Sequence, residues 1–224
     1  MTHDLAIGDR AYSSWSLRGW LLFDAFGIPV DVHRAQMRTP EFPALLDAFS
    51  PARTVPTARL DGAVVWDSLA IAEELAARHP EAGLWPADPG LRAIARSIAA
   101  EMHSGYGALR STCPMNLRTA WAFEPSDNVR ADLKRIEAVW AHAWEASGGP
   151  WLCGEYSVAD VFHAPVAMRI AGYGLSVSEA ARTYVNRHLS HPSFRRWREA
   201  AMDDGPDQEM YDMGLPRRPF PEAI

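Results

Sequence analysis

Hydroxyl side chains gather near the N-terminus in Tyr12-Ser13-Ser14, directly before a helix predicted over residues 14–27. The first turn of a helix has unpaired backbone N–H groups and the positive end of the helix dipole, so it attracts an anion. A hydroxyl there donates a hydrogen bond worth roughly 1.5–3 kcal/mol to a charged acceptor. These residues suit the stabilisation of an anion. The plainer interpretation is that Ser14 caps the helix and Ser13 is a loop residue.

A second polar pair, Asp67-Ser68, stands where a β-hairpin over residues 57–66 runs into a helix predicted over residues 68–79. The free N–H groups of that helix and the Ser68 hydroxyl suit a carboxylate, and the Asp67 carboxylate suits an ammonium group. Asp67 is also a plain N-cap candidate. Capping and ligand binding are compatible.

Between these pairs lies Val55-Pro56, directly before the first strand of the hairpin. A cis X–Pro bond would turn the N–H and C=O of Val55 outward, where an extended peptide can pair with them like an added strand. The alternative is a trans proline that opens an edge strand.

Three further polar residues, His103, Tyr106 and Arg110, are spaced i, i+3 and i+7 within a helix predicted over residues 91–119. That spacing puts them on one helical face. The face is a candidate wall of a substrate pocket, with Arg110 placed to hold a carboxylate. The alternative is that it meets the other half of the chain or another subunit.

The elements that must position these groups follow the order βαβαββα over residues 1–80, and a linker with Gly83, Pro86 and Pro89 occupies residues 81–90. Only helices are predicted over residues 91–205, and the tail at 206–224, with its four prolines, is predicted to be irregular. The predicted helices of the second half span residues 91–119, 128–147, 158–171, 178–190 and 193–203.

Composition limits the function classes. The 224 residues are 48% hydrophobic and carry a net charge of −6, which argues against nucleic acid as a partner. We find no apolar run of about 18 residues and no signal segment, so we expect a cytoplasmic protein that does not span a membrane. Cys113 and Cys153 form no CxxC pair, so neither a metal site nor a redox pair is expected. A thiol used in chemistry would have to arrive on a ligand.

The chain resembles the soluble glutathione transferases over roughly residues 4–203. The motifs that carry the resemblance are Ser13-Ser14 with Arg18, Val55-Pro56, Asp67-Ser68, and a Ser157–Asp160 capping box after Gly154. The resemblance implies an α/β thioredoxin-like N-terminal domain and an all-α helical-bundle C-terminal domain. It also implies glutathione as co-substrate, a small electrophile as second substrate, no metal, and a homodimer.

Carried over to this sequence, the resemblance makes Ser13 or Ser14 the hydrogen-bond donor to the thiol, and the similarity to the zeta class favours Ser13. Glutathione binding falls to Val55, Pro56, Asp67 and Ser68. The electrophile pocket falls to Tyr12, His103, Tyr106 and Arg110, with Tyr12 also a third choice of thiol donor. Arg18 is expected to make a structural ion pair or to hold the domain interface.

The double serine is most similar to the zeta class, the class of maleylacetoacetate isomerases. That class typically reads Ser-Ser-Cys-Ser-Trp-Arg, whereas Trp15 and Leu17 stand at the Cys and Trp positions here. The expected activity is thiolate attack on a small electrophile, in the form of conjugation or of cis–trans isomerisation. The alternative is a binding or interaction module of the same fold without turnover. A thiol-disulfide oxidoreductase would need a cysteine where Ser13 and Ser14 stand.

The energetics of thiol activation fit one serine. An alkyl thiol has a pKa of about 8.5, and the thiolate is its reactive form. Lowering that pKa by about two units takes about 2.7 kcal/mol of selective stabilisation. One hydroxyl donor and a helix N-terminus together supply most of it.

Overall fold

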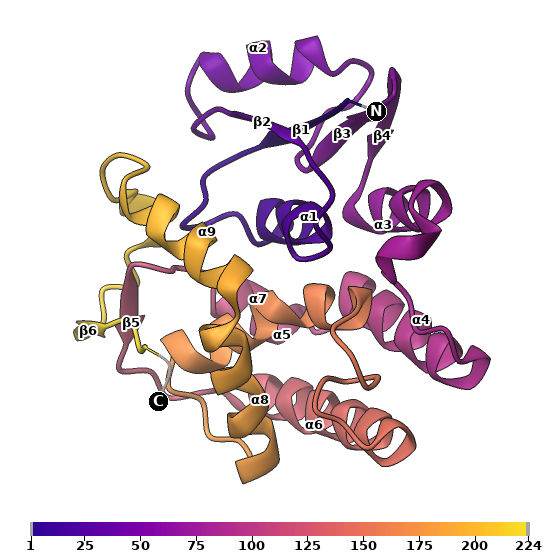
Figure 1. The fold of residues 1–224 in the computed structure, drawn as a ribbon. Coiled ribbons are helices and arrows are strands. Elements are labelled where there is room, and N and C mark those ends of the chain that lie inside the picture. Colours follow the sequence, from indigo (N-terminus) through magenta and orange to yellow (C-terminus); the bar gives the residue numbers. More distant parts are fainter. Residues whose placement is uncertain (1, 223–224) are drawn as a thin grey trace.

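The computed structural model describes residues 2–222. The first half is a four-stranded sheet in the order β2-β1-β3-β4, in which β1 and β2 are parallel and the other neighbours are antiparallel. Helix α2 (Glu41–Ala48) lies on one face of the sheet, and α1 (Ser14–Asp24) and α3 (Ser68–Arg78) lie on the other (Figure 1). This is the predicted thioredoxin-like arrangement. The strands are β1 (His3–Ile7), β2 (Asp31–Arg34), β3 (Thr57–Leu60) and β4 (Ala63–Trp66).

Helix α1 is packed tightly against the sheet, with Leu17, Leu21 and Leu22 fully buried. Its closest approach is at Gly19, where an added Cβ would lie 2.4 Å from the Cβ of Pro56. Only glycine fits at that contact, because real Cβ atoms do not come so close to another carbon. The helix that carries the serines is thereby held directly beside Val55-Pro56.

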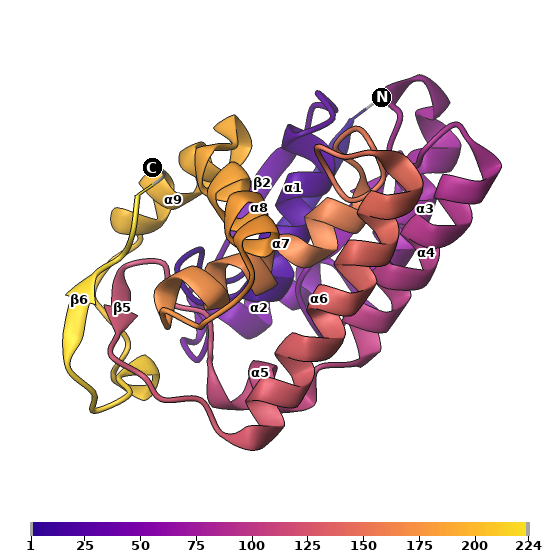
Figure 2. The same ribbon diagram turned by 90° about the horizontal axis from the view of Figure 1, so that it is seen from below.

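The second half is a bundle of helices below the sheet layer (Figures 1 and 2). Its central helix, α7, is buried on nearly every side, because its sequence is apolar all round rather than on one stripe. The helices are α4 (Pro89–Ser104), α5 (Gly107–Thr112), α6 (Asp127–Ser147), α7 (Val158–Gly172), α8 (Glu179–Ser190) and α9 (Pro192–Met202), after a short 3-10 turn η1 (Pro80–Ala82).

The capping box at the start of α7 is present. The Asp160 carboxylate accepts hydrogen bonds from the Ser157 N–H at 2.9 Å, the Leu152 N–H at 3.0 Å and the Tyr184 hydroxyl at 2.9 Å. Burial raises the pKa of Asp160 to about 6, against the pull of these donors. Asp160 therefore fixes the start of α7 and has no place at the candidate site.

The helix predicted over residues 91–119 is wrong as a single element. Helix α4 ends at Ser104, Gly105 is extended, and Tyr106 has a left-handed backbone with φ 56° before the short α5 begins. Gly105 and Gly107 lower the helix propensity of this stretch, and the Gly105 N–H closes α4 on the Glu101 carbonyl.

The expectations of an exclusively helical second half and an irregular tail are also wrong in part. Strand β5 (Thr119–Trp121) pairs with β6 (Arg217–Pro219) in a two-stranded antiparallel ribbon, and a 3-10 turn η2 (Glu209–Tyr211) precedes β6. The pairing joins residues about a hundred positions apart, and local periodicity cannot reveal such a contact.

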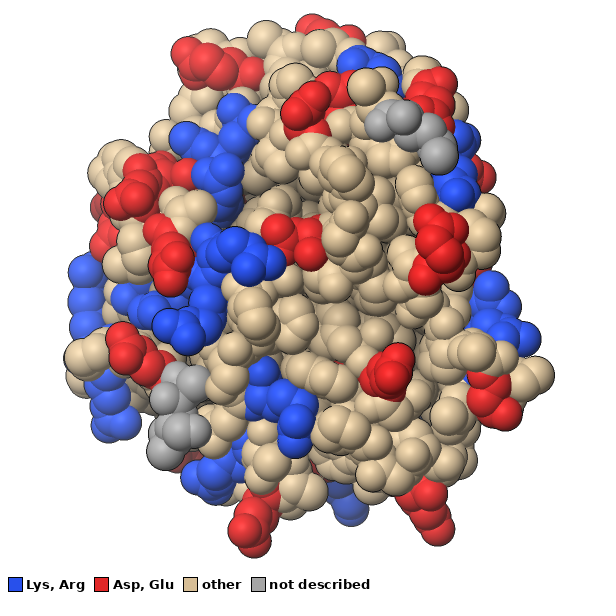
Figure 3. All heavy atoms as spheres, viewed as in Figure 1, with Lys and Arg blue, Asp and Glu red and all other residues tan. Residues whose placement is uncertain are grey.

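Charges of both signs are interspersed on the surface that Figure 3 displays. Positive side chains gather there on the side where Figure 1 places α9 and the β5–β6 ribbon, with acidic side chains between them. Within residues 2–222, no helix is long and apolar enough to cross a membrane. The same residues contain no group of three His, Cys, Asp or Glu side chains that could hold a metal ion.

Candidate functional site

The hydroxyl of Ser13 is used inside its own turn. Ser13 is the N-cap of α1, and its Oγ accepts the Ser16 N–H at 3.2 Å and lies 2.8 Å from the Ser16 Oγ. The Ser16 Oγ in turn accepts the Gly8 N–H at 2.9 Å. Ser13 is buried. Because its Oγ accepts the Ser16 N–H, Ser13 caps α1, and the sequence-based suggestion that Ser14 is the cap is wrong.

Ser14 is the first residue of α1 and is only half-buried. Its Oγ lies 3.5 Å from Nη2 of Arg169, a buried residue of α7. The Arg169 guanidinium is fixed by donation to the carbonyls of Cys113 (2.9 Å) and Pro165 (3.1 Å). Burial lowers the pKa of Arg169 to about 10, so it remains a cation at neutral pH. Sequence reasoning missed Arg169, which lies in the mainly apolar helix α7.

A pocket of about 310 Å³ opens between the start of α1 and the start of α3. Four residues that the sequence proposed for glutathione binding line it together, and the Val55–Pro56 peptide bond is cis. The lining residues are Trp15, Thr54, Val55, Pro56, Asp67 and Ser68.

The start of α3 has two unusual features. Asp67 caps the helix by accepting the Leu69 N–H at 2.8 Å, and its φ of 77° is a backbone conformation that costs energy for a residue with a side chain. Ser68 is fully buried, yet its hydroxyl makes no hydrogen bond within residues 2–222. A buried polar atom without a partner at a helix N-terminus in a pocket fits an anionic ligand such as a carboxylate.

The Trp15 side chain lines the pocket and also contacts residues of α4 and α5. The guanidinium carbons of Arg18 and Arg110 lie 4.7 and 5.1 Å from its ring centre, within cation–π range. The His103 ring contacts it edge-on at 5.3 Å, and His103 Nε2 lies 3.3 Å from an Asp67 oxygen. Trp15 was noted in the sequence only as a departure from the zeta-class motif.

Arg18 is fully buried between Trp15 of α1 and Phe162 of α7. Its Nε and Nη1 atoms find no acceptor in the described part of the chain. Burial, together with Arg169 and Arg110, lowers the pKa of Arg18 to about 9. Of the two structural roles expected for Arg18, the structure gives it the place at the domain interface, and it makes no ion pair with the residues that the structure describes.

The remaining predicted residues divide into two groups. His103 and Arg110 reach Trp15 at the edge of the pocket, and Arg110 also donates to the carbonyls of His103 and Gly105, both at 3.2 Å. Tyr12 and Tyr106 do not line the pocket. The Tyr106 hydroxyl donates to Glu101 at 3.0 Å, because its left-handed backbone takes it off the face that His103 occupies.

Tyr12 is held by the C-terminal tail. Its hydroxyl donates to Asp207 and accepts the Gln208 N–H, both at 3.2 Å, and its ring stacks on Tyr211 at 4.3 Å between centroids. Burial raises the pKa of Tyr12. With its hydroxyl engaged on the tail, Tyr12 is poorly placed to donate to a thiol.

Comparison with known proteins identifies the family to which this chain belongs. A family model described as the N-terminal domain of glutathione S-transferase matches residues 12–78. Maleylacetoacetate isomerase from Mus musculus is 33% identical over 192 residues, which cover 80% of this chain and 84% of the mouse protein. The chain belongs to the glutathione S-transferase family. The Pseudomonas aeruginosa maleylacetoacetate isomerase is 27% identical over 88% of this chain and 96% of its own length, so the likeness within the family is to the zeta class.

Solved structures support the same two-domain fold at lower identity. A glutathione transferase homologue from Burkholderia, solved with bound glutathione, superposes with a TM-score of 0.69 at 20% identity, covering 91% of this chain and 100% of that one. Glutathione transferase Omega 3C from Trametes versicolor gives a TM-score of 0.68 at 19% identity, covering 94% and 91%. As a family member, this glutathione S-transferase has the predicted architecture of a thioredoxin-like domain followed by a helical one.

Proposed function

We propose that this glutathione S-transferase binds glutathione in the pocket between the starts of α1 and α3. It would present the glutathione thiol as a thiolate to a small electrophile. One observation carries the proposal: the starts of α1 and α3 converge on one pocket, with Val55-Pro56 between them. A peptide with an anionic end and a thiol matches that arrangement of groups. Family membership and isomerase relatives over most of the chain support a glutathione-dependent enzyme.

The start of α3 would hold the γ-glutamyl end. The Ser68 hydroxyl and the first N–H groups of α3 suit its carboxylate, and the Asp67 carboxylate suits its ammonium group. His103 Nε2 lies 3.3 Å from an Asp67 oxygen and limits the positions that this carboxylate can take. Val55 would pair with the backbone of the bound peptide in the manner of an added strand.

Of the two serines, the contacts favour Ser14 as the donor to the thiolate. Ser13 is already bonded within its turn, to both the N–H and the hydroxyl of Ser16. The Ser14 hydroxyl has Arg169 as its donor at 3.5 Å, which leaves its own proton free to point at a sulfur. The buried cations Arg18 and Arg169 add a positive potential on the same side, and this favours an anion further.

Arg110 beside Trp15 supports an acidic second substrate. Only one of its terminal nitrogens is used on carbonyls of its own segment. The remaining donors suit a carboxylate. We propose cis–trans isomerisation of a maleylacetoacetate-type compound, the activity that the names of the relatives carry. The thiolate would add to one alkene carbon, and the π electron pair would move to the conjugated carbonyl as an enolate. The former double bond, now single, would rotate. Collapse of the enolate would form the trans double bond and break the C–S bond, so that the thiolate leaves with its electron pair.

The second candidate is a module of the same fold that binds without turnover. The observation that favours it is Trp15, whose large ring forms a wall of the pocket at the position where the zeta class has a small cysteine. A non-catalytic module would bind glutathione with an ordinary thiol pKa, or not at all.

A homodimer, implied by the family resemblance, is also a proposal. Trp66 stands on the edge strand β4 with 47% of its surface exposed, and a large exposed aromatic side chain suits a subunit interface. Light scattering on the purified protein tests this. A mass of twice the 24.8 kDa chain is expected, and Trp66→Ser should shift it towards one chain.

Turnover tests the proposed reaction directly. Maleylacetone, a cis-enone carboxylate, is offered with glutathione, and its loss and the formation of the trans isomer are followed. Isomerisation that requires glutathione is the expected result. Arg110→Met should raise KM more than it lowers kcat, because Arg110 is assigned to the substrate carboxylate. Absence of both isomerisation and conjugation, with glutathione bound, would favour the non-catalytic module.

A further inference from the structure

The turn that leads into the serines is held by the opposite half of the chain through its backbone. The Arg10 N–H donates to Asp204 Oδ2 at 3.2 Å, and the Arg10 carbonyl accepts the Trp197 indole N–H at 3.0 Å. The next carbonyl, that of Ala11, accepts the Leu117 N–H at 3.1 Å. Three backbone polar groups of Arg10 and Ala11 therefore depend on residues more than a hundred positions away.

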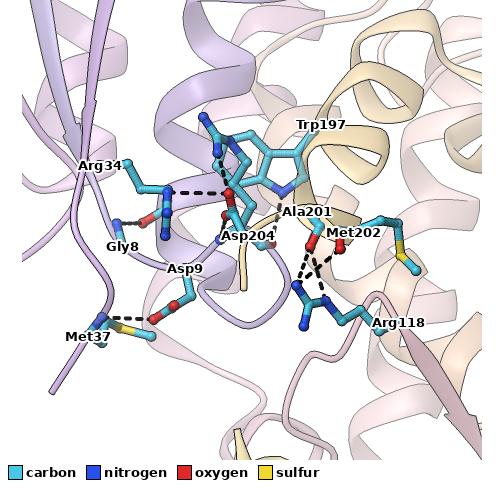
Figure 4. A network of polar contacts seen from close by, with 11 residues as sticks. Gly8, Asp9, Arg34, Met37, Arg118, Trp197, Ala201, Met202 and Asp204 are labelled. Atoms are coloured by element: carbon cyan, nitrogen blue, oxygen red, sulfur yellow. Dashed lines mark hydrogen bonds and ion pairs between the residues drawn. The ribbon is translucent and has the colours of Figure 1, made fainter. Parts of the chain in front are cut away.

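Asp204 is the charged centre of this contact (Figure 4). Its side chain is 8% exposed, and its Oδ1 lies 2.6 Å from Arg10 Nη1 and 3.3 Å from Arg34 Nε. Arg34 is the last residue of β2. The Asp204 carboxylate thus links the segment after α9 to the end of β2 and to the turn at residues 9–13, which we call the serine turn. Little solvent reaches this carboxylate to screen its charge.

The position of Arg10 is passed on to Ser13 by a compact turn. The Ser13 N–H donates to the Asp9 carbonyl at 2.8 Å, and the Tyr12 N–H reaches the same carbonyl at 3.3 Å. The Asp9 carboxylate accepts the Met37 N–H at 2.9 Å, which anchors the other end (Figure 4). Residues 9–13 form one hydrogen-bonded unit, so a displacement at Arg10 moves the N-cap of α1.

The position of Asp204 is fixed in turn by the C-terminal end of α9. Arg118 caps the C-terminus of α9 by donating through Nε and Nη2 to the Ala201 carbonyl, at 3.0 and 2.8 Å (Figure 4). A cation at the last carbonyls of a helix is favourable. Asp204 follows that cap by three residues, so the place where α9 ends decides where its carboxylate stands.

We propose that Asp204 is a positioning residue for thiol activation. It fixes the turn that begins α1, and with it Ser13 and Ser14, without touching glutathione. The inference rests on the proposed function above, because it concerns the placement of the proposed thiol donor. It adds a requirement that the glutathione site alone does not suggest: the geometry of the N-terminal site depends on a charge that follows the last helix.

Asp204→Asn tests this, because asparagine keeps the size and an acceptor for the Arg10 N–H but removes the charge that holds two arginines. The matched control is Asp203→Asn, an exposed neighbour. In each protein the pKa of the bound glutathione thiol is measured from thiolate absorbance, with the dissociation constant of glutathione and the melting temperature. Asp204→Asn should raise the bound thiol pKa by about one unit, with the dissociation constant changed less than about twofold. Asp203→Asn should change neither.

The outcomes separate the two claims. A lower melting temperature with an unchanged thiol pKa makes Asp204 merely structural and overturns the inference, while the proposed function stands. A thiol pKa that is not depressed in the unsubstituted protein overturns the proposed function, and this inference with it. If Asp204→Asn does not fold, Trp197→Phe removes the indole N–H bond to Arg10 and keeps a ring in the core. It should raise the thiol pKa in the same direction, and an unchanged value contradicts the inference.

Discussion

The guanidinium of Arg18 lies 4.7 Å from the centre of the Trp15 ring and 5.0 Å from that of Phe162. Two of its nitrogens have no acceptor within residues 2–222. Cation–π attraction to two aromatic rings offsets only part of the free energy needed to remove a cation from water. A buried cation of this kind, next to a pocket with an unpartnered serine, is an arrangement that an anionic ligand completes.

Replacing Arg18 with methionine should therefore separate stability from function. We expect the free energy of unfolding of the ligand-free protein to be unchanged or to rise by about 1–2 kcal/mol, because an unpaired buried charge is removed. The pKa of the bound glutathione thiol should rise, because a positive charge near it is lost. Chemical denaturation and thiolate absorbance measure the two effects. Arg195→Met, at an exposed arginine, is the control. A destabilised protein with an unchanged thiol pKa would show that Arg18 serves the fold alone.

Ser68→Ala should affect binding and not folding. The hydroxyl makes no hydrogen bond among the described residues, so the ligand-free protein should melt at the same temperature or slightly higher. Loss of a hydrogen bond to a carboxylate should weaken glutathione binding by about tenfold, or about 1.4 kcal/mol. Calorimetric titration measures this. Asp67→Ala is the comparison: it should weaken binding and also lower the melting temperature, because Asp67 caps α3. An unaltered dissociation constant in Ser68→Ala would remove that hydroxyl from the site.

Gly19→Ala should destabilise the protein although alanine favours helices. An alanine Cβ would lie 2.4 Å from Pro56, so the helix or the proline must move, at a cost of about 1–3 kcal/mol. Glutathione binding should weaken as well, because Pro56 lines the pocket. Gly107→Ala is the matched control, since nothing lies within 4 Å of its added Cβ. It should stabilise α5 by up to about 1 kcal/mol. Two variants with the same unfolding free energy would contradict the close contact.

His163 predicts a loss of stability in acid. It is fully buried in α7, and its Nδ1 lies 2.9 Å from the Ala159 carbonyl. Burial lowers the pKa of His163 to about 4, although that hydrogen bond opposes the change. In the unfolded chain the ordinary value of 6.5 applies, so the unfolded state binds more protons between these values. The neutral histidine's contribution is fully present above pH 6.5 and is lost as the pH falls towards 4, a difference of about 3 kcal/mol.

Urea unfolding across that range measures the effect. The slope of unfolding free energy against pH measures how many more protons the unfolded state binds than the folded state. Between pH 6.5 and 4, His163→Gln should lower that number by close to one. His142→Gln, at an exposed histidine, should leave the slope unchanged. Other buried histidines, such as His188, contribute in the same direction in all three proteins. Equal slopes in the three proteins would contradict a neutral, buried His163.

Local signals were enough for much of the fold. The hairpin predicted over residues 57–66 is present, Ser157 and Asp160 form their capping box, and the order βαβαββα follows from strand and helix patterns. The pocket wall of Val55, Pro56, Asp67 and Ser68 follows from motifs at element ends. Such features depend on a few neighbouring residues, so the sequence specifies them directly.

What the sequence could not indicate depends on distant contacts. The break of α4 at Gly105 removed Tyr106 from the expected face, and two glycines were the one local sign of it. Arg169 reaches Ser14 from a helix 155 positions away, and Asp204 reaches Arg10 across 194 positions. No periodicity encodes those pairings. Trp15 belongs to the same group, because its role as a wall appears only when Arg18, His103 and Arg110 are seen around it.

The most direct test of thiol activation is a pH titration of bound glutathione, following thiolate absorbance in the unsubstituted protein, Ser14→Ala and Ser13→Ala. We expect a bound thiol pKa about two units below the free value in the unsubstituted protein, a loss of most of that shift in Ser14→Ala, and mainly a lower melting temperature in Ser13→Ala. A bound thiol with the ordinary pKa of a free alkyl thiol, or the same shift in all three proteins, would contradict activation by the serine turn.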